Sequence, residues 1–166
     1  MFDDASFSAC GRYRFTLTRH LGGGPAVAFV MLNPSTADAS VNDPTIRRCM
    51  GFARAWGFGL LRVVNLYAWR ATKPADMWFA ERARTCITGG PENDAAIRTA
   101  ASAADLVVAA WGAHARDDRA QEALALIRAS GKTPMCLGIT KGGAPRHPLM
   151  VTNTTALVPF EMKEAA

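Results

Sequence analysis

The order of apolar and polar positions predicts a chain in which strands alternate with helices. Residues 12–19 alternate polar and apolar side chains, as in a strand that buries one face. Residues 26–32 form a continuous apolar run, as in a strand that is buried on both faces. By the same criteria, we expect further strands at residues 60–66, 105–110 and 135–137.

Helical spacing of apolar residues occurs between these strands. Asp43 is a typical N-cap, Pro44 is a typical first-turn residue, and the helical pattern that follows ends at Gly57. Two further helices are expected at residues 91–103 and 117–130. Because strands that alternate with helices form βαβ units, the sequence predicts a three-layer α/β domain, with a short, mostly parallel sheet flanked by helices.

Ligands bind beyond the carboxyl ends of the strands in a sheet of this kind. The polar segments that directly follow the predicted strands are therefore the candidate sites. These segments are residues 33–39, 65–72, 111–119 and 140–148.

The composition agrees with a globular domain. The apolar share of 49% and the charged share of 20% are ordinary, and 166 residues can bury a full core. With no linker or repeat to divide them, residues 1–166 are expected to form a single domain. No apolar run approaches the roughly 18 residues of a membrane-spanning helix. Since the acidic start of the chain does not resemble a signal peptide, we expect a cytoplasmic protein with no membrane partner.

The four cysteines are scattered, at Cys10, Cys49, Cys86 and Cys136. No CxxC pair is present in the sequence, whereas a zinc or iron–sulfur site usually shows tighter spacing. We therefore expect free thiols, mostly buried, and neither a metal nor another cofactor.

The chain is basic, with a net charge of +5 and a pI of about 9.4. Positive charge favours a polyanionic partner, and arginine, which outnumbers lysine here, suits bidentate contacts with phosphate. A genome of biased base composition would produce the same excess of arginine. The charge alone therefore does not decide between nucleic-acid binding and an ordinary basic surface.

Two of the strand-end segments carry amides and hydroxyls that could hold a substrate. Asn33, Ser35 and Thr36 follow the second predicted strand, where they could contact a substrate and a water or simply form a turn. Asn65 ends the next strand, and a buried amide there needs a hydrogen-bond partner. That partner could be the backbone or the edge of a base.

The segment 140–148 is the most suggestive of the strand-end loops. Its two glycines permit close backbone approach, Lys141 and Arg146 carry positive charge, and His147 lies between charged and rigid neighbours. A neutral imidazole can donate to an oxygen that becomes negative, although a surface histidine bonded to the backbone would show the same sequence. The motifs of serine hydrolases, P-loop proteins and HExxH metalloproteases are absent from the sequence.

Five motifs together resemble the family called domain of unknown function 1643. They are MLNPSTAD (31–38), DPTIRRC (43–49), VNL (64–66), WG (111–112) and RHPL (146–149). The resemblance covers nearly the whole chain, but the family label implies no activity.

The order of four motifs is also similar to that of the uracil-DNA glycosylase superfamily. In that superfamily, Asp or Asn before Pro follows a buried strand, an Asn that reads the base ends the middle strand, Trp-Gly ends a later strand, and His-Pro lies in a DNA-contacting loop. The matching residues are Asn33, Asn65, Trp111 and His147. The resemblance implies a uracil-DNA-glycosylase-like fold and a hydrolase of DNA repair that cleaves the bond between a base and deoxyribose.

The resemblance implies a role for each matching residue. Asn33 would position the attacking water, Asn65 would bind the flipped base, and His147 would stabilise negative charge on the departing base. Phosphates would be held by basic side chains, namely Arg47, Arg48, Lys141 and Arg146. Leu149 could fill the space of the flipped base or could be a core residue.

The chain departs from the superfamily pattern at several positions. Asn33 replaces the carboxylate of the most active branches, and because an amide cannot take a proton from water, slow or highly selective catalysis is expected. Ser35 and Thr36 stand where a bulky aromatic residue would exclude 5-substituted pyrimidines, so a modified pyrimidine could bind beside them. Leu149 and Met150 replace the usual Ser-Pro, and the four-cysteine cluster of the iron–sulfur branches is absent.

The sequence leaves three functions open. The first is a glycosylase acting on a uracil-like or modified pyrimidine, in DNA rather than RNA. The second is a nucleic-acid-binding module that has the same fold without catalysis. The third is a hydrolase or transferase that acts on a free nucleotide or another small anion, and that would show little salt-dependent affinity for long DNA.

Overall fold

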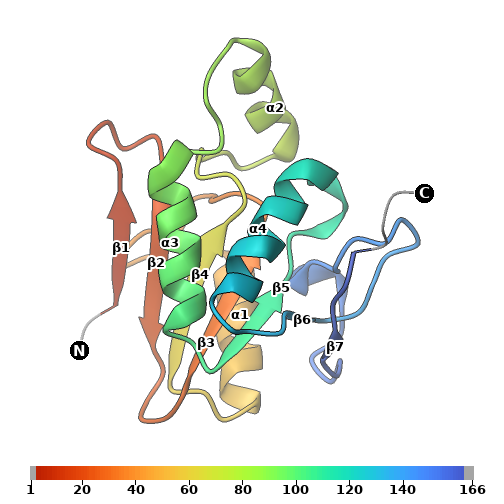
Figure 1. The fold of residues 1–166 in the computed structure, drawn as a ribbon. Coiled ribbons are helices and arrows are strands. Elements are labelled where there is room, and N and C mark those ends of the chain that lie inside the picture. Colours follow the sequence, from red (N-terminus) through yellow and green to blue (C-terminus); the bar gives the residue numbers. More distant parts are fainter. Residues whose placement is uncertain (1–2, 163–166) are drawn as a thin grey trace.

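A computed structural model describes residues 3–162 of the chain (Figure 1). A seven-stranded sheet with the order β1-β2-β4-β3-β5-β6-β7 forms its centre. The strands are β1 (Asp4–Phe7), β2 (Arg14–His20), β3 (Ala26–Met31), β4 (Leu60–Asn65), β5 (Leu106–Ala109), β6 (Met135–Cys136) and β7 (Val158–Pro159).

The sheet is parallel at its centre and antiparallel at its edges. β4, β3, β5 and β6 run parallel, whereas β1, β2 and β7 pair antiparallel with their neighbours. The short connection at residues 21–25 reverses the chain, so β2 runs opposite to β3 and to β4. The predicted parallel sheet is therefore correct for the central strands.

Helices cover both faces of the sheet. They are α1 (Pro44–Ala55), α2 (Pro74–Arg82), α3 (Gly90–Ser102) and α4 (Asp117–Ala129), with short 3₁₀ turns at η1 (Gly112–His114) and η2 (Pro148–Met150). α3 and α4 lie side by side in front of the sheet, and α1 lies behind it (Figure 1). This arrangement confirms the predicted three-layer α/β architecture.

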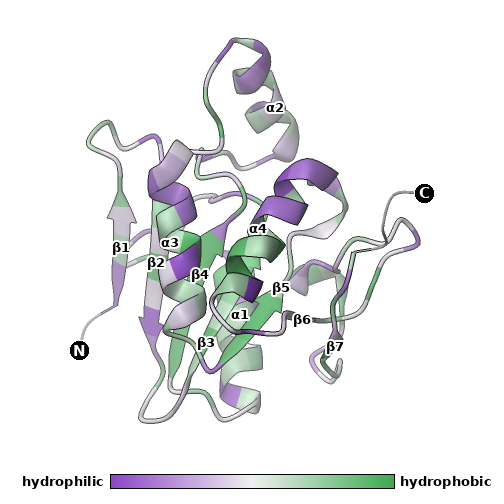
Figure 2. Ribbon diagram, viewed as in Figure 1, coloured by the Kyte–Doolittle hydropathy of each residue, from purple (hydrophilic) through white to green (hydrophobic). Residues whose placement is uncertain are grey.

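Each face of the sheet has its own apolar core. On one face, Ile97 of α3 and Leu124 of α4 are fully buried against the strands. On the other face, Ile46 and Phe52 of α1 pack with Phe29 of β3. Figure 2 shows the hydrophobic colour concentrated on the central strands. Because helices cover both of its sides, β3 is buried over its whole length, as its continuous apolar run predicts.

The elements with regular periodicity are present within a few residues of their predicted bounds. Asp43 caps α1 as expected, since its Oδ1 accepts the N–H of Ile46 at 2.8 Å. β1, α2 and β7 were not predicted. The main apolar residues of α2 form one consecutive run, from Met77 to Ala80, and no side chain caps its start. A helix of this kind leaves no helical period to recognise.

The cysteines are free, but only half of them are buried. Cys49 and Cys136 lie in the core, whereas Cys10 and Cys86 are exposed. The expectation of mostly buried thiols is therefore wrong for two of the four, because these two lie in loops outside the apolar cores. Within residues 3–162, no helix is long and apolar enough to cross a membrane.

The topology leaves an opening at the carboxyl ends of the central strands. From β3 the chain passes through α1 to β4 on one side of β3, and from β4 it passes through α3 to β5 on the other side. Connections that diverge in this way create the crevice in which α/β proteins bind ligands. A binding site is therefore expected beyond β3, β4 and β5.

Candidate functional site

A pocket of about 810 Å³ lies at the carboxyl ends of the parallel strands. Its walls come from the segments after β3, β4, β5 and β6, together with the start of α1 and the start of β2. This volume is typical of a site for a small molecule. The polar side chains of its lining include Arg14, Asn33, Ser35, Thr36, Asp43, Asn65, Thr140, Lys141, Arg146 and His147.

Most of the predicted site residues meet in this one pocket. The predicted residues in its lining are Asn33, Ser35, Thr36, Asn65, Lys141, Arg146, His147 and Leu149. Arg47 and Arg48 lie on α1 and do not line it. The loops meet because parallel strands all end at the same edge of a sheet.

Within the side chain of Asn33, the oxygen is free to contact a ligand and the nitrogen is not. Its Nδ2 donates to the backbone oxygen of Ala71 at 2.7 Å and to that of Pro34 at 3.0 Å. Since both partners can only accept, these contacts assign the orientation of the amide. Oδ1 can therefore accept a hydrogen bond from a water or a substrate, while the NH₂ group is already used within the protein.

Asn65 is 1% exposed, yet its amide has an unused donor. Its backbone oxygen accepts from Nδ2 of Asn93 at 2.9 Å, but its own Nδ2 has no partner within the described residues. Leaving a buried polar group unpaired costs about 1–3 kcal/mol. The backbone does not provide a partner for this Nδ2 among the described residues. A ligand that pairs with the amide would remove the cost.

His147 presents a neutral ring with a defined proton position. Its Nδ1 accepts the N–H of Leu149 at 3.2 Å, at the start of η2. Because a nitrogen that accepts carries no proton, the proton of the neutral ring lies on Nε2. Burial lowers the pKa of His147 from its ordinary value of 6.5, against the nearby negative charge of Asp43. The ring is therefore a neutral Nε2–H donor at pH 7.

Two charged residues of the pocket were not predicted as site residues. The sequence indicates Asp43 only as a cap, but the residue also lines the pocket, and its Oδ2 has no hydrogen-bond partner in the part of the chain described. Alternation along β2 predicts Arg14 on the solvent face, but the pairing of β2 with β1 skips Phe15, and this bulge turns Arg14 toward the segment of Ala37 instead. The side chain is buried there, and its Nη1 donates to the backbone oxygen of Ala37 at 2.6 Å. Nothing in the sequence distinguishes Arg14 from the other polar residues of its strand.

The two predicted phosphate-binding arginines of α1 differ in their surroundings. The guanidinium of Arg48 donates to oxygens of the segment that carries His147, namely those of Pro148, Val151 and Asn153. Arg48 therefore ties α1 to that segment. Arg47 is exposed and donates to the backbone oxygen of Asn42 at 2.6 Å.

The rim of the pocket combines positive charge with apolar side chains. Lys141 and Arg146 are exposed there. Leu149 is 49% exposed and Met150 is 73% exposed. Leu149 is therefore not a core residue, which leaves contact with a ligand as its other interpretation. The described residues contain no group of three or more His, Cys, Asp or Glu side chains that could hold a metal ion.

A family model described as "Protein of unknown function (DUF1643)" matches residues 14–149. This range begins at Arg14 and ends at Leu149, so it includes every residue discussed for the pocket except Met150. Neither a curated protein nor a solved structure gives a significant match. The resemblance to the uracil-DNA glycosylase superfamily receives no support from these comparisons and stays a prediction.

Proposed function

The chain belongs to the DUF1643 family, as its motifs predict, and because the family's description names no activity, we propose a function from the site itself. The protein hydrolyses the N-glycosidic bond between deoxyribose and a uracil-like or modified pyrimidine base in DNA. Since the pocket has the volume of a small-molecule site, a base in a duplex has to leave the stack to enter it.

The observation that carries the proposal is the presence of three free polar groups in one pocket. They are the unpaired amide of Asn65, the Nε2–H of His147 and the Oδ1 of Asn33. A pyrimidine presents neighbouring donors and acceptors at its ring edge, which one amide can match. A neutral imidazole donor suits a base that leaves with negative charge.

Each step of the reaction has a suitable side chain. Oδ1 of Asn33 accepts a hydrogen bond from the attacking water, whose oxygen bonds to C1′ of the sugar. Oδ2 of Asp43 takes the proton that the water loses, a step that the amide of Asn33 cannot perform. As the C1′–N bond breaks, its electron pair goes to the base, and the Nε2–H of His147 stabilises the resulting negative charge.

The rim suits a DNA backbone next to the flipped nucleotide. Lys141 and Arg146 contact phosphates, and Arg47 extends this surface along α1. Leu149 fills the space that the base leaves in the stack. Arg48 has a positioning role instead of a phosphate contact, because its N–H groups are bonded within the protein.

Base release from oligonucleotides tests the proposal. The substrates carry uracil, mismatched thymine, hypoxanthine or a 5-substituted pyrimidine, for which Ser35 and Thr36 leave room. We expect wild type to release at least one pyrimidine, and Asn33→Ala and His147→Ala to slow its release about 100-fold or more. Arg98→Ala, which removes an exposed arginine of α3 outside the pocket, should release the base at the wild-type rate.

Two other results would contradict a glycosylase. Salt-sensitive DNA binding without release of any base would indicate a non-catalytic nucleic-acid-binding module. Saturable binding of a free nucleotide, with little affinity for long DNA, would indicate a hydrolase or transferase of free nucleotides.

A further inference from the structure

Three arginines are buried among the described residues, and they differ in what they contact: Arg14, Arg19 and Arg119. Arg119 pairs with two carboxylates, at 2.7 and 2.9 Å. All three side-chain nitrogens of Arg19 donate to protein oxygens, and Asp3 lies 3.6 Å from it. Burial of these two side chains is thus explained by partners within the protein.

Arg14 has only one such partner. Its Nη1 donates to the backbone oxygen of Ala37. Its Nε is buried without a hydrogen-bond partner, and within residues 3–162 we find no partner for Nη2 and no carboxylate that forms a salt bridge with it. Burial lowers the pKa of Arg14 to about 10, so the side chain is still cationic at neutral pH.

The topology brings this cation to the pocket. β2 runs antiparallel to β4, so the first residue of β2 lies at the carboxyl end of β4, where Asn65 is. Arg14 lines the pocket although it is 2% exposed. Arg14, Asp43 and His147 line the same pocket. Within residues 3–162, neither a hydrogen bond nor a salt bridge joins Asp43 to Arg14.

We infer that Arg14 forms an oxyanion subsite in the pocket, where its Nε–H and Nη2–H donate to a negatively charged oxygen of the ligand. A guanidinium offers parallel donors that suit such an oxygen, and a buried charge without a partner is otherwise unfavourable. The identity of this oxygen rests on the proposed function: it is a ring carbonyl oxygen of the base, which gains negative charge as the C1′–N bond breaks. A phosphate oxygen of a nucleotide has the same chemistry and is the other source to test.

Equilibrium binding of small anions to the full chain tests the subsite without requiring catalysis. The probes are 5-nitrouracil, which is ionised at neutral pH, uracil, which is neutral, and inorganic phosphate. In calorimetric titrations, we expect wild type to bind 5-nitrouracil about tenfold or more tightly than uracil, as one hydrogen bond between charged groups allows. Arg14→Gln should reduce this ratio to the part that the Nε2–H of His147 supplies, and Arg14→Lys, which keeps the charge without the fork, should give an intermediate ratio.

Arg19→Gln is the matched control. It removes a buried arginine from the same strand, but Arg19 does not line the pocket and its hydrogen bonds are internal. We expect this variant to keep the wild-type preference for 5-nitrouracil, even where thermal unfolding shows that it is less stable than wild type.

Two results would overturn the inference. One is equal binding of 5-nitrouracil and uracil by wild type, without binding of phosphate, and the other is a preference for 5-nitrouracil that Arg14→Gln leaves unchanged. Binding of phosphate but not of 5-nitrouracil, dependent on Arg14, would uphold the subsite and contradict the base as its ligand. Binding of 5-nitrouracil, dependent on Arg14, by a protein that releases no base from DNA would uphold the subsite and contradict the glycosylase.

Discussion

Asn33 and Asn65 are the same type of residue after neighbouring strands, but the protein uses their amides differently. Nδ2 of Asn33 is held by two backbone oxygens, whereas Nδ2 of Asn65 has no partner in the part of the chain that is described. An acceptor with a fixed direction suits the orientation of a water, and an unpaired amide suits recognition of a base. The sequence could predict both residues as candidates but not this difference, because it depends on which backbone oxygens lie nearby.

His147 should make the stability of the protein depend on pH. Burial lowers its pKa below 6.5 in the folded state, so the unfolded chain binds a proton more readily, and stability is lost as the pH falls below about 6.5. His147→Asn keeps a capping side chain and removes this titration. In urea titrations, the free energy of unfolding of wild type should rise relative to that of the variant from about pH 5 to about pH 7. A difference that is constant over this range would contradict a half-buried, neutral His147.

Among the helices, α2 shows why local pattern is not always sufficient. Contacts from outside the helix hold it in place: Arg116 lies over the ring of Trp78 at 4.6 Å and donates to both carboxylate oxygens of Glu81. Tyr67 packs edge-on against Trp78, with ring centroids 5.1 Å apart. These partners lie far from α2 in the sequence, so its periodicity does not reveal them. The helices that could be predicted bury regular apolar stripes against the sheet.

The start of α1 combines a structural role with a proposed chemical one, and two substitutions of Asp43 separate them. Asp43→Asn keeps a good N-cap, so stability should change little, but base release should slow about 100-fold or more because an amide cannot take the proton. Asp43→Ala should lose the same activity and also lower the free energy of unfolding by about 1 kcal/mol. Urea denaturation and base-release rates measure the two effects. Wild-type rates in Asp43→Asn would assign Asp43 to the cap alone.

At the scale of the whole molecule, the sequence predicts the position of the pocket but not all of the charged residues that line it. The loops after β3 to β6 reach one edge of the sheet because these strands run parallel. Arg14 enters from the antiparallel strand β2, at a position that alternation predicts to be exposed, because the bulge at Phe15 interrupts the alternation. The segment of Ala37 covers Arg14 through a contact between residues far apart in the sequence. Such long-range coverage is not contained in the local pattern of β2.

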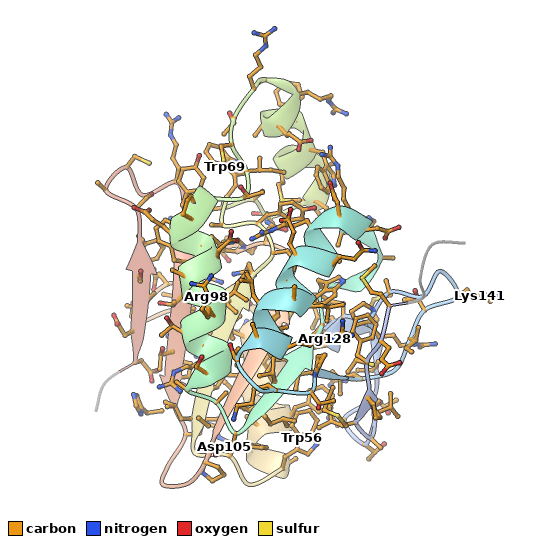
Figure 3. All side chains as sticks on the ribbon, viewed as in Figure 1. Trp56, Trp69, Arg98, Asp105, Arg128 and Lys141 are labelled. Carbon is orange, nitrogen blue, oxygen red and sulfur yellow. The ribbon has the colours of Figure 1, made fainter. Side chains whose placement is uncertain are left out.

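The placement of charge over the whole molecule offers a test of the proposed binding of DNA at the pocket. Lys141 lies on a loop at one side of the molecule, away from Arg98 on α3 and Arg128 on α4 (Figure 3). Replacing Lys141 and Arg146 by Gln should remove two phosphate contacts and reduce the slope of log Kobs against log salt by about 2. Replacing Arg98 and Arg128 by Gln changes the net charge equally but should leave the slope unchanged. Equal slopes for the two double variants would mean that overall charge, rather than the rim of the pocket, attracts DNA.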